Sequence, residues 1–166
     1  MQDLILNSNR IFVGAAGRSL LAMKFLAMRL MQIGLKVYLV GEVCTPSIRE
    51  GDLLLVGSGS GETAGMIAIC KKAKAAGAEV AVFTKKRNST IESIAKVAGQ
   101  LNTAKPIQEG AADPDGWIEG NYFSIRPSGN PFEQSIVIVG DAMVCELMQK
   151  TNCGTAKIAY NHANLE

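Results

Sequence analysis

The sequence predicts a doubly wound α/β fold of the flavodoxin-like kind, a three-layer sandwich in which helices cover both faces of a five-stranded parallel sheet. Short runs that are apolar throughout alternate with segments of helical periodicity, and such runs are typical of strands buried on both faces. Glycine-rich segments follow two of these runs, where the strands of a parallel sheet end and ligands bind. The 166 residues suit one domain with a full-sized core.

The first three-quarters of the chain supplies the predicted strands and all but one of the helices. Strands are expected at residues 10–13, 36–40, 53–56, 79–83 and, as the fifth, near 99–102. Helices are expected at residues 19–33, 62–76 and 90–98. Ser19 is the expected N-terminal cap of the first helix, and Gly34 and Gly77 are expected to end the first and second.

The last part of the chain changes character. Residues 103–130 are rich in Gly, Pro, Asp and Asn, which indicates a long irregular connection. Pro131 then suits the first turn of a helix. Residues 136–139 alone would also suit a strand, but apolar residues continue at helical spacing for four turns, so a helix is predicted. Residues 151–166 are expected to form a polar tail, and the whole of 1–166 to be a single domain.

Composition excludes several classes of protein. A formal net charge of +2 is too small to indicate binding to nucleic acid or to an anionic membrane. The four cysteines lack the C-x-x-C spacing of a zinc site, and there is a single histidine. We interpret the cysteines as reduced thiols of a cytoplasmic protein, with two disulfides as the alternative. Neither a signal peptide nor a membrane-spanning run is expected.

The stretch G-S-G-S-G-E-T at residues 57–63, called here the glycine–hydroxyl loop, follows the strand expected at 53–56. It precedes a helix start, where unpaired N–H groups and the helix dipole favour anions. Glycines let the backbone close around a phosphate, and three hydroxyls add donors. The alternative is a flexible turn with a serine cap. The predicted phosphate ligands in this loop are Ser58, Gly59, Ser60, Gly61 and Thr63.

The loop lacks the motifs of nucleotide sites. It has no lysine followed by Ser or Thr for a triphosphate, and G-x-G-x-G is not the dinucleotide pattern. Neutral hydroxyls instead suit one phosphomonoester.

The S-G-S-G-E-T motif resembles that of the sugar isomerase (SIS) domain. Four further segments look like one branch of that family, the 6-phospho-3-hexuloisomerases, and the resemblance covers nearly the whole chain. They are Gly17-Arg18-Ser19 with "FLAMRL" at 25–30, Gly41-Glu42 with Thr45-Pro46, Phe132-Glu133-Gln134, and "HANLE" at 162–166. The branch usually opens with a helical segment, whereas this chain is expected to begin almost at its first strand.

The resemblance implies interconversion of D-arabino-hex-3-ulose 6-phosphate and fructose 6-phosphate through a cis-enediolate. This chemistry needs a base that carries a proton between C2 and C3, and donors that stabilise the developing charge. The resemblance implies no redox cofactor and no metal. It also implies a homo-oligomer, a dimer or tetramer, in the ribulose monophosphate pathway of formaldehyde fixation.

Two carboxylates are candidates for the base. Glu133 lies in the first turn of the last long helix, and the resemblance favours it. From the residue alone we would prefer a carboxylate that interacts with the helix dipole. Glu42 follows the second strand and is the rival base or a ligand of sugar hydroxyls; the alternative is a solvated loop carboxylate.

Three further residues receive roles from the resemblance. His162 is the proton shuttle or a hydroxyl ligand in its own site or a neighbouring subunit's, although a lone tail histidine is ordinarily solvated. Arg18 contacts the phosphate or the enediolate, or else forms a surface salt bridge. Ser19 joins the phosphate site.

Other polar and apolar residues receive structural interpretations. Glu62 is expected to stabilise the helix start and point away from the phosphate. Residues 85–87, Lys-Lys-Arg, are interpreted as a solvated loop, although they would also steer an anionic substrate. Met23, Met28 and Met31 are assigned to the core or a subunit interface. A sugar-phosphate-sensing regulator would need a DNA-binding segment, for which the N-terminus is too short, and an isomerase of another phosphosugar stays open.

Overall fold

The computed structural model describes residues 1–101 and 130–165, so nearly all of the predicted irregular segment lies outside the described residues. In chain order the elements are α1 (Gln2–Asn7), β1 (Ile11–Ala15), α2 (Gly17–Gln32), β2 (Val37–Leu39), β3 (Leu53–Gly57), α3 (Ala64–Ala75), β4 (Glu79–Thr84), α4 (Thr90–Ile94), β5 (Val97–Gln100), α5 (Asn130–Thr151) and α6 (Thr155–Tyr160).

The five strands form one parallel sheet in the order β2-β1-β3-β4-β5, which confirms the predicted fold class. Ala15 at the end of β1 pairs with Gly57 at the end of β3, and Gly57 pairs with Phe83 of β4. The order of the strands reverses at β1, because β2 lies on one side of β1 and β3 lies on the other. Ligands of open α/β sheets bind at such a switch point, beyond the carboxyl ends of the strands. The segments after β1, β3 and β4 therefore meet there.

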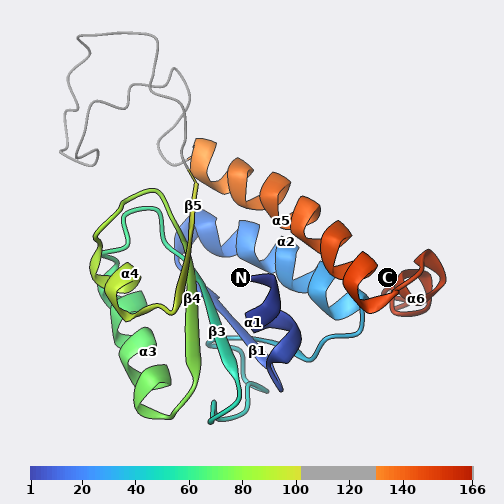
Figure 1. The fold of residues 1–166 in the computed structure, drawn as a ribbon, viewed down its shortest axis with the longest axis horizontal. Helices are drawn as coiled ribbons and strands as arrows, with labels where there is room; N and C mark the ends of the chain where they lie inside the picture. Colours follow the sequence, from blue (N-terminus) through green and yellow to red (C-terminus); the bar gives the residue numbers. More distant parts are fainter. Residues whose placement is uncertain (102–129, 166) are drawn as a thin grey trace, which may run out of the picture.

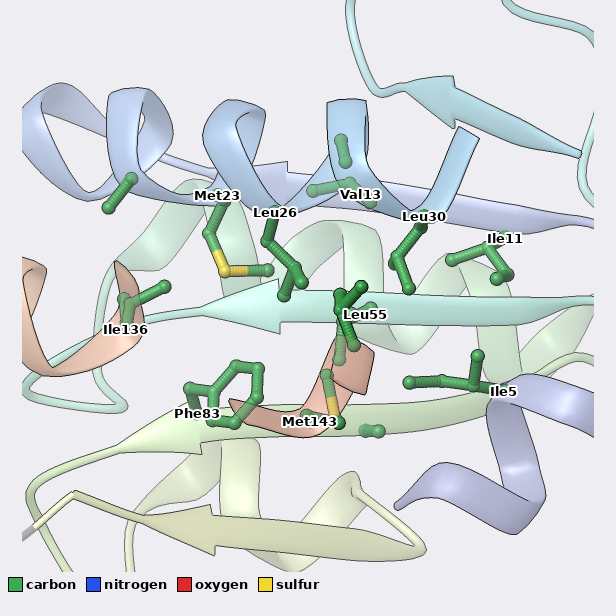
Figure 2. Close-up of a cluster of buried hydrophobic side chains, with 14 of the residues drawn as sticks. Ile5, Ile11, Val13, Met23, Leu26, Leu30, Leu55, Phe83, Ile136 and Met143 are labelled. Carbon is green, nitrogen blue, oxygen red and sulfur yellow. The ribbon is translucent and has the colours of Figure 1, made fainter. Parts of the chain in front are cut away.

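Helices cover both faces of the sheet, as Figure 1 shows. Helices α1, α2 and α5 lie on one face, and α3 and α4 lie on the other. Figure 2 shows the larger core cluster, in which Met23 and Leu26 of α2, Ile136 of α5, and Leu55 and Phe83 of the sheet come together. Burying these side chains between layers is the main stabilising term of such a fold.

Helix α1 was not predicted, and the expectation that the chain begins almost at its first strand is wrong. Its six residues are too few for a helical period to stand out in the sequence. Ile5 is nonetheless fully buried in the main core cluster. The Lys150 ammonium of α5 lies 3.0 Å from the Asp3 carboxylate, so α1 is also tied to the last long helix.

The segment expected as a helix at 90–98 divides into α4 and β5. Ser89 caps α4, its hydroxyl oxygen accepting from the Glu92 N–H, and the helix ends at Ile94. Val97 and Ala98 pair instead with Ala81 and Val82 of β4. Pairing with a neighbouring strand overrides the local helical pattern here.

The prediction for the N-terminal cap of α2 is also wrong. Ala16, not Ser19, occupies the N-cap of α2, and Gly17 begins the helix with a φ of +55° that favours glycine. Within the predicted polar tail, residues Thr155–Tyr160 form the short helix α6.

Candidate active site

Glycine at the end of β3 lets the two long helices approach the sheet where the site lies. A Cβ on Gly57 would lie 2.7 Å from Met23 Cγ and 3.5 Å from Ile136 Cδ1. A larger residue would push α2 or α5 away from the strand. The close approach brings the first turns of α2 and α5 to the same edge as the glycine–hydroxyl loop.

The glycine–hydroxyl loop is held in one conformation by its own hydroxyls. Ser58 Oγ accepts from the Gly61 N–H at 3.1 Å and lies 3.1 Å from Thr63 Oγ1. Ser60 Oγ accepts from the Glu62 N–H at 3.2 Å. Gly61 has a φ of +65°, in the region that favours glycine. The loop is therefore a formed turn, whereas a flexible turn was the alternative.

The segment after β4 supports the loop from behind, which the sequence did not indicate. The Gly59 carbonyl accepts from the Lys85 N–H at 3.1 Å and from the hydroxyl of the buried Thr84 at 3.3 Å. The Gly61 carbonyl accepts from the Ile91 N–H at 3.1 Å. No local pattern identifies these residues, because they lie more than twenty positions from the loop.

Glu62 belongs to the same support and does not act at the start of its own helix α3. Its Oε1 accepts from the Thr90 N–H at 3.0 Å, at the first residue of α4. This hydrogen bond, helped by the charge of Lys86, lowers the pKa of the Glu62 carboxyl below its usual range. The carboxylate thus links the glycine–hydroxyl loop to α4.

Helix α3 begins directly after the loop and turns its first amides toward it. The Met66 and Ile67 N–H groups both donate to the Thr63 carbonyl. Ala64 and Gly65 occupy the first two helical positions, where an N–H has no partner within the helix, and both are exposed. The loop hydroxyls and these amides together make an arrangement that suits an anion.

Arg18 and Glu133 come together beside this loop from α2 and α5. Arg18 Nε lies 3.5 Å from Glu133 Oε2, and the two side chains are 63% and 12% exposed. Glu133 Oε2 is shielded from water and accepts no hydrogen bond from the described residues. A carboxylate oxygen in this state is free to take up a proton from a bound molecule.

A groove of about 500 Å³ runs between α2 and α5 from this ion pair, and we call it the α2–α5 groove. Its walls are largely apolar, and Leu21 and Ile138 in them are 67% and 69% exposed. Phe132 precedes Glu133 in the sequence. Its Cδ1 lies 3.3 Å from the position that a Cβ on Gly59 would occupy. The groove and the glycine–hydroxyl loop are therefore neighbours.

Two predicted residues, Glu42 and Ser19, are not among the residues that line the α2–α5 groove. The Glu42 carboxylate lies 3.0 Å from Lys24 Nζ and is 56% exposed. Ser19 is half-buried in the first turn of α2, next to Arg18. Its predicted contact with phosphate stays a prediction.

His162 lies at the other end of the molecule from Glu133. Its ring Nδ1 is 3.1 Å from the Ala163 carbonyl oxygen, and the side chain is exposed. The preceding Asn161 donates to the carbonyl of Gln32, the last residue of α2. Arg18 is at the first turn of this 16-residue helix, which is about 24 Å long. Within one chain, the tail therefore does not reach the ion pair.

Comparison with known proteins decides the family. The SIS domain model matches residues 4–112. The chain belongs to the SIS domain family. Over its whole length this SIS protein is 38% identical to a 3-hexulose-6-phosphate isomerase of Bacillus subtilis, of which it covers 85%. Over 98% of its length it is 36% identical to the 3-hexulose-6-phosphate isomerase of Mycobacterium gastri, of which it covers 76%.

A solved structure agrees with this grouping. The SIS protein superposes with a TM-score of 0.83 and 31% identity on a hypothetical protein of Methanococcus jannaschii, covering 99% of this chain and 83% of that one. The structure of that protein was described as inferring a molecular function of 3-hexulose-6-phosphate isomerase.

Neither a metal centre nor a membrane span is found in the part of the chain that the structure describes. No three His, Cys, Asp or Glu residues among 1–101 and 130–165 lie close enough to hold a metal ion. No helix in these ranges combines the length and the apolar character needed to cross a membrane.

Proposed function

We propose that this chain is a 3-hexulose-6-phosphate isomerase, which interconverts D-arabino-hex-3-ulose 6-phosphate and D-fructose 6-phosphate. The full-length similarity to isomerases of that name supports the substrate. The observation that carries the chemistry is the shielded Oε2 of Glu133, which accepts no hydrogen bond from the described residues and lies beside a loop that suits an anion. A single SIS domain over residues 1–166 would supply the phosphate loop, Arg18 and Glu133 of each site.

In the proposed mechanism, the glycine–hydroxyl loop and Ser19 bind the phosphate, and the sugar extends toward Phe132 and Glu133. Glu133 removes the proton from C2 of the 3-ketose and returns it to C3, through a cis-enediolate. The hydroxyl proton of O2 moves to O3, so the carbonyl ends at C2. Arg18 stabilises the oxygen on which negative charge develops.

The proposal assigns the base to Glu133 rather than Glu42. Glu42 is more than half exposed and bound to Lys24, so water and an ammonium both compete for its oxygens. Glu133 is largely buried, and only the long contact with Arg18 approaches its Oε2 among the described residues. Glu42 then serves as a ligand of sugar hydroxyls when the substrate is bound.

We further propose that the enzyme is a homo-oligomer, a dimer or tetramer, whose subunits share sites through the C-terminal tail. His162 of one chain would complete the site of another, as proton shuttle or hydroxyl ligand. Exposed apolar side chains on the faces that would meet support this assignment. They are Leu21, Phe25, Met28, Met31, Ile138 and Val139.

The proposed setting is the ribulose monophosphate pathway of formaldehyde fixation in the cytoplasm. All four cysteines are free thiols, and two of them, Cys44 and Cys145, are exposed. Exposed thiols persist in a reducing compartment. The pathway follows from the proposed substrate.

A coupled assay tests the proposal. Fructose 6-phosphate formed from the 3-hexulose phosphate is converted to glucose 6-phosphate and read as NADPH from its dehydrogenase. Turnover that is abolished by Glu133→Gln would support the assignment. If calorimetry shows binding of fructose 6-phosphate but the assay shows no turnover, the proposal is contradicted and a sugar-phosphate sensor is favoured. Faster turnover of another phosphosugar would identify that sugar as the substrate.

A further inference from the structure

Lys85 lies against the glycine–hydroxyl loop with both its backbone and its side chain. It follows Thr84, the last residue of β4, and its N–H donates to the Gly59 carbonyl at 3.1 Å. Its Cε lies 3.3 Å from the point that a Cβ on Gly59 would occupy. The Phe132 ring approaches the same point at 3.3 Å, so the aliphatic stem and the ring flank Gly59.

The glycine–hydroxyl loop itself offers no positive charge to a bound phosphate. The loop offers a phosphate hydroxyls and amides, which are neutral donors, whereas a phosphomonoester carries about −1.5 to −2 at neutral pH. The side chain of Lys85 is half-buried with its Cε beside Gly59, so its ammonium is held close to the loop.

We propose that Lys85 binds the phosphate of the substrate and makes the site selective for dianionic phosphosugars. The inference rests on the proposed function and deepens it, because it names the cation of the same site. The Lys85 side chain already packs beside Gly59, so less conformational entropy is lost when the ammonium meets the anion. Of the three cationic residues at 85–87, the proposal places only Lys85 in the phosphate site.

This role predicts a pH dependence that a structural role would not produce. The second proton of a phosphomonoester dissociates near pH 6, so the dianion becomes a monoanion as the pH falls through that value. A cationic ligand gains more from the dianion than from the monoanion. KM should therefore rise as the pH falls below about 6, and this rise should be weaker when Lys85 has lost its charge.

The test uses Lys85→Met, which keeps the stem and removes the charge, with Lys85→Arg as the conservative variant and Lys86→Met as the matched control. We expect Lys85→Met to raise KM, and the inhibition constant of inorganic phosphate, by about ten- to a hundredfold. Turnover at saturation should stay within about twofold, because the ammonium contacts substrate and transition state alike. Lys85→Arg should recover most of the affinity, and Lys86→Met should resemble wild type.

Two results would overturn the inference. One is a Lys85→Met variant that folds, by thermal unfolding, and binds phosphate like Lys86→Met. The other is a loss of turnover with unchanged KM, which would place Lys85 in the chemical step instead. If the wild-type chain fails to turn over the hexulose phosphate, calorimetric titration with inorganic phosphate and fructose 6-phosphate still compares the variants. The failure of the proposed function and that of the Lys85 inference are thus distinguishable.

Discussion

The two halves of the candidate site differ in how they are held. The glycine–hydroxyl loop is fixed by its own hydroxyls and by hydrogen bonds from Thr84, Lys85, Thr90 and Ile91. Among the described residues, the end that carries Glu133 has one long ion pair, a carboxylate oxygen without a hydrogen bond, and an apolar groove open to solvent. In the proposed arrangement, the phosphate half lies within one chain, whereas His162 of a second copy would complete the catalytic half.

This difference has a physical reason. A binding loop gains affinity when its donors are already in place, because little entropy is lost on binding. A base must instead keep an oxygen free for the proton it moves. In the proposed arrangement, the other groups of the catalytic half come from the substrate or from a second copy of the chain.

The largest expected effect comes from changing the base. Glu133→Gln keeps the size of the side chain but removes its basicity, so turnover should fall by about 10²–10⁴. KM should change much less, because the phosphate is bound by another segment. The matched variant Glu42→Gln keeps a side chain that can hydrogen-bond to sugar hydroxyls, so it should keep most of the turnover. The measurement is steady-state kinetics of both variants; the reverse result would transfer the base to Glu42.

The second prediction tests whether the catalytic half is completed by another subunit. His162→Asn should reduce turnover by about 10²-fold or more if the histidine moves a proton. Neither His162→Asn nor Glu133→Gln alone should be active. Unfolding the two variants together and refolding them should restore activity, because some sites then combine an intact Glu133 with an intact His162.

The control for this experiment is each variant refolded by itself. Sedimentation of the mixed sample would confirm that hybrid oligomers have formed. Hybrids without activity would show that both residues act within one chain, which would require the tail to leave its place beside Gln32.

The sheet could be predicted from sequence because its strands are coded locally. Residues 53–56 and 79–83 are apolar runs of strand length, and each is flanked by glycine or polar turns. β5 was harder to place, because residues 97 and 98 continue the helical pattern of α4 and become strand only through pairing with β4. Its identity depends on a neighbour that the local sequence does not contain.

The candidate site shows the same division. The three hydroxyls of the glycine–hydroxyl loop lie between residues 58 and 63, so a short motif was enough to propose them as phosphate ligands. The roles of Glu133 and His162 needed a family resemblance, since each alone has an ordinary structural explanation. The contact of Lys85 with Gly59 joins two strand ends and appears only after the sheet is assembled.

The third prediction concerns variants of the glycine–hydroxyl loop. Ser60→Ala and Thr63→Ala should each lower the affinity for phosphosugar by about 1–3 kcal/mol, the value of a charge-assisted hydrogen bond. Turnover at saturation should change little. Ser58→Ala should lower the melting temperature most of the three, because Ser58 is buried and its Oγ both accepts from the Gly61 N–H and contacts Thr63 Oγ1. Calorimetry with fructose 6-phosphate separates these cases, and full affinity in all three variants would place the phosphate elsewhere.

The smallest effect is expected at Glu62, which links the glycine–hydroxyl loop to α4 through the Thr90 N–H. Glu62→Ala removes the acceptor of the Thr90 N–H, so the loop should loosen, and KM should rise only a few fold with turnover preserved. Glu62→Gln keeps an acceptor oxygen and should be closer to wild type.

The lowered pKa of Glu62 predicts how its contribution to stability depends on pH. The folded state lowers the pKa of the carboxyl below its ordinary value near 4.5, so the folded chain binds fewer protons there than the unfolded chain. The stabilisation is therefore present above that value and is lost as the pH falls through the lower, folded pKa. The gap in melting temperature between wild type and Glu62→Ala should be constant near neutral pH and should close in acid. A gap that stays open in acid would show that the Thr90 contact stabilises the loop without the charge of Glu62.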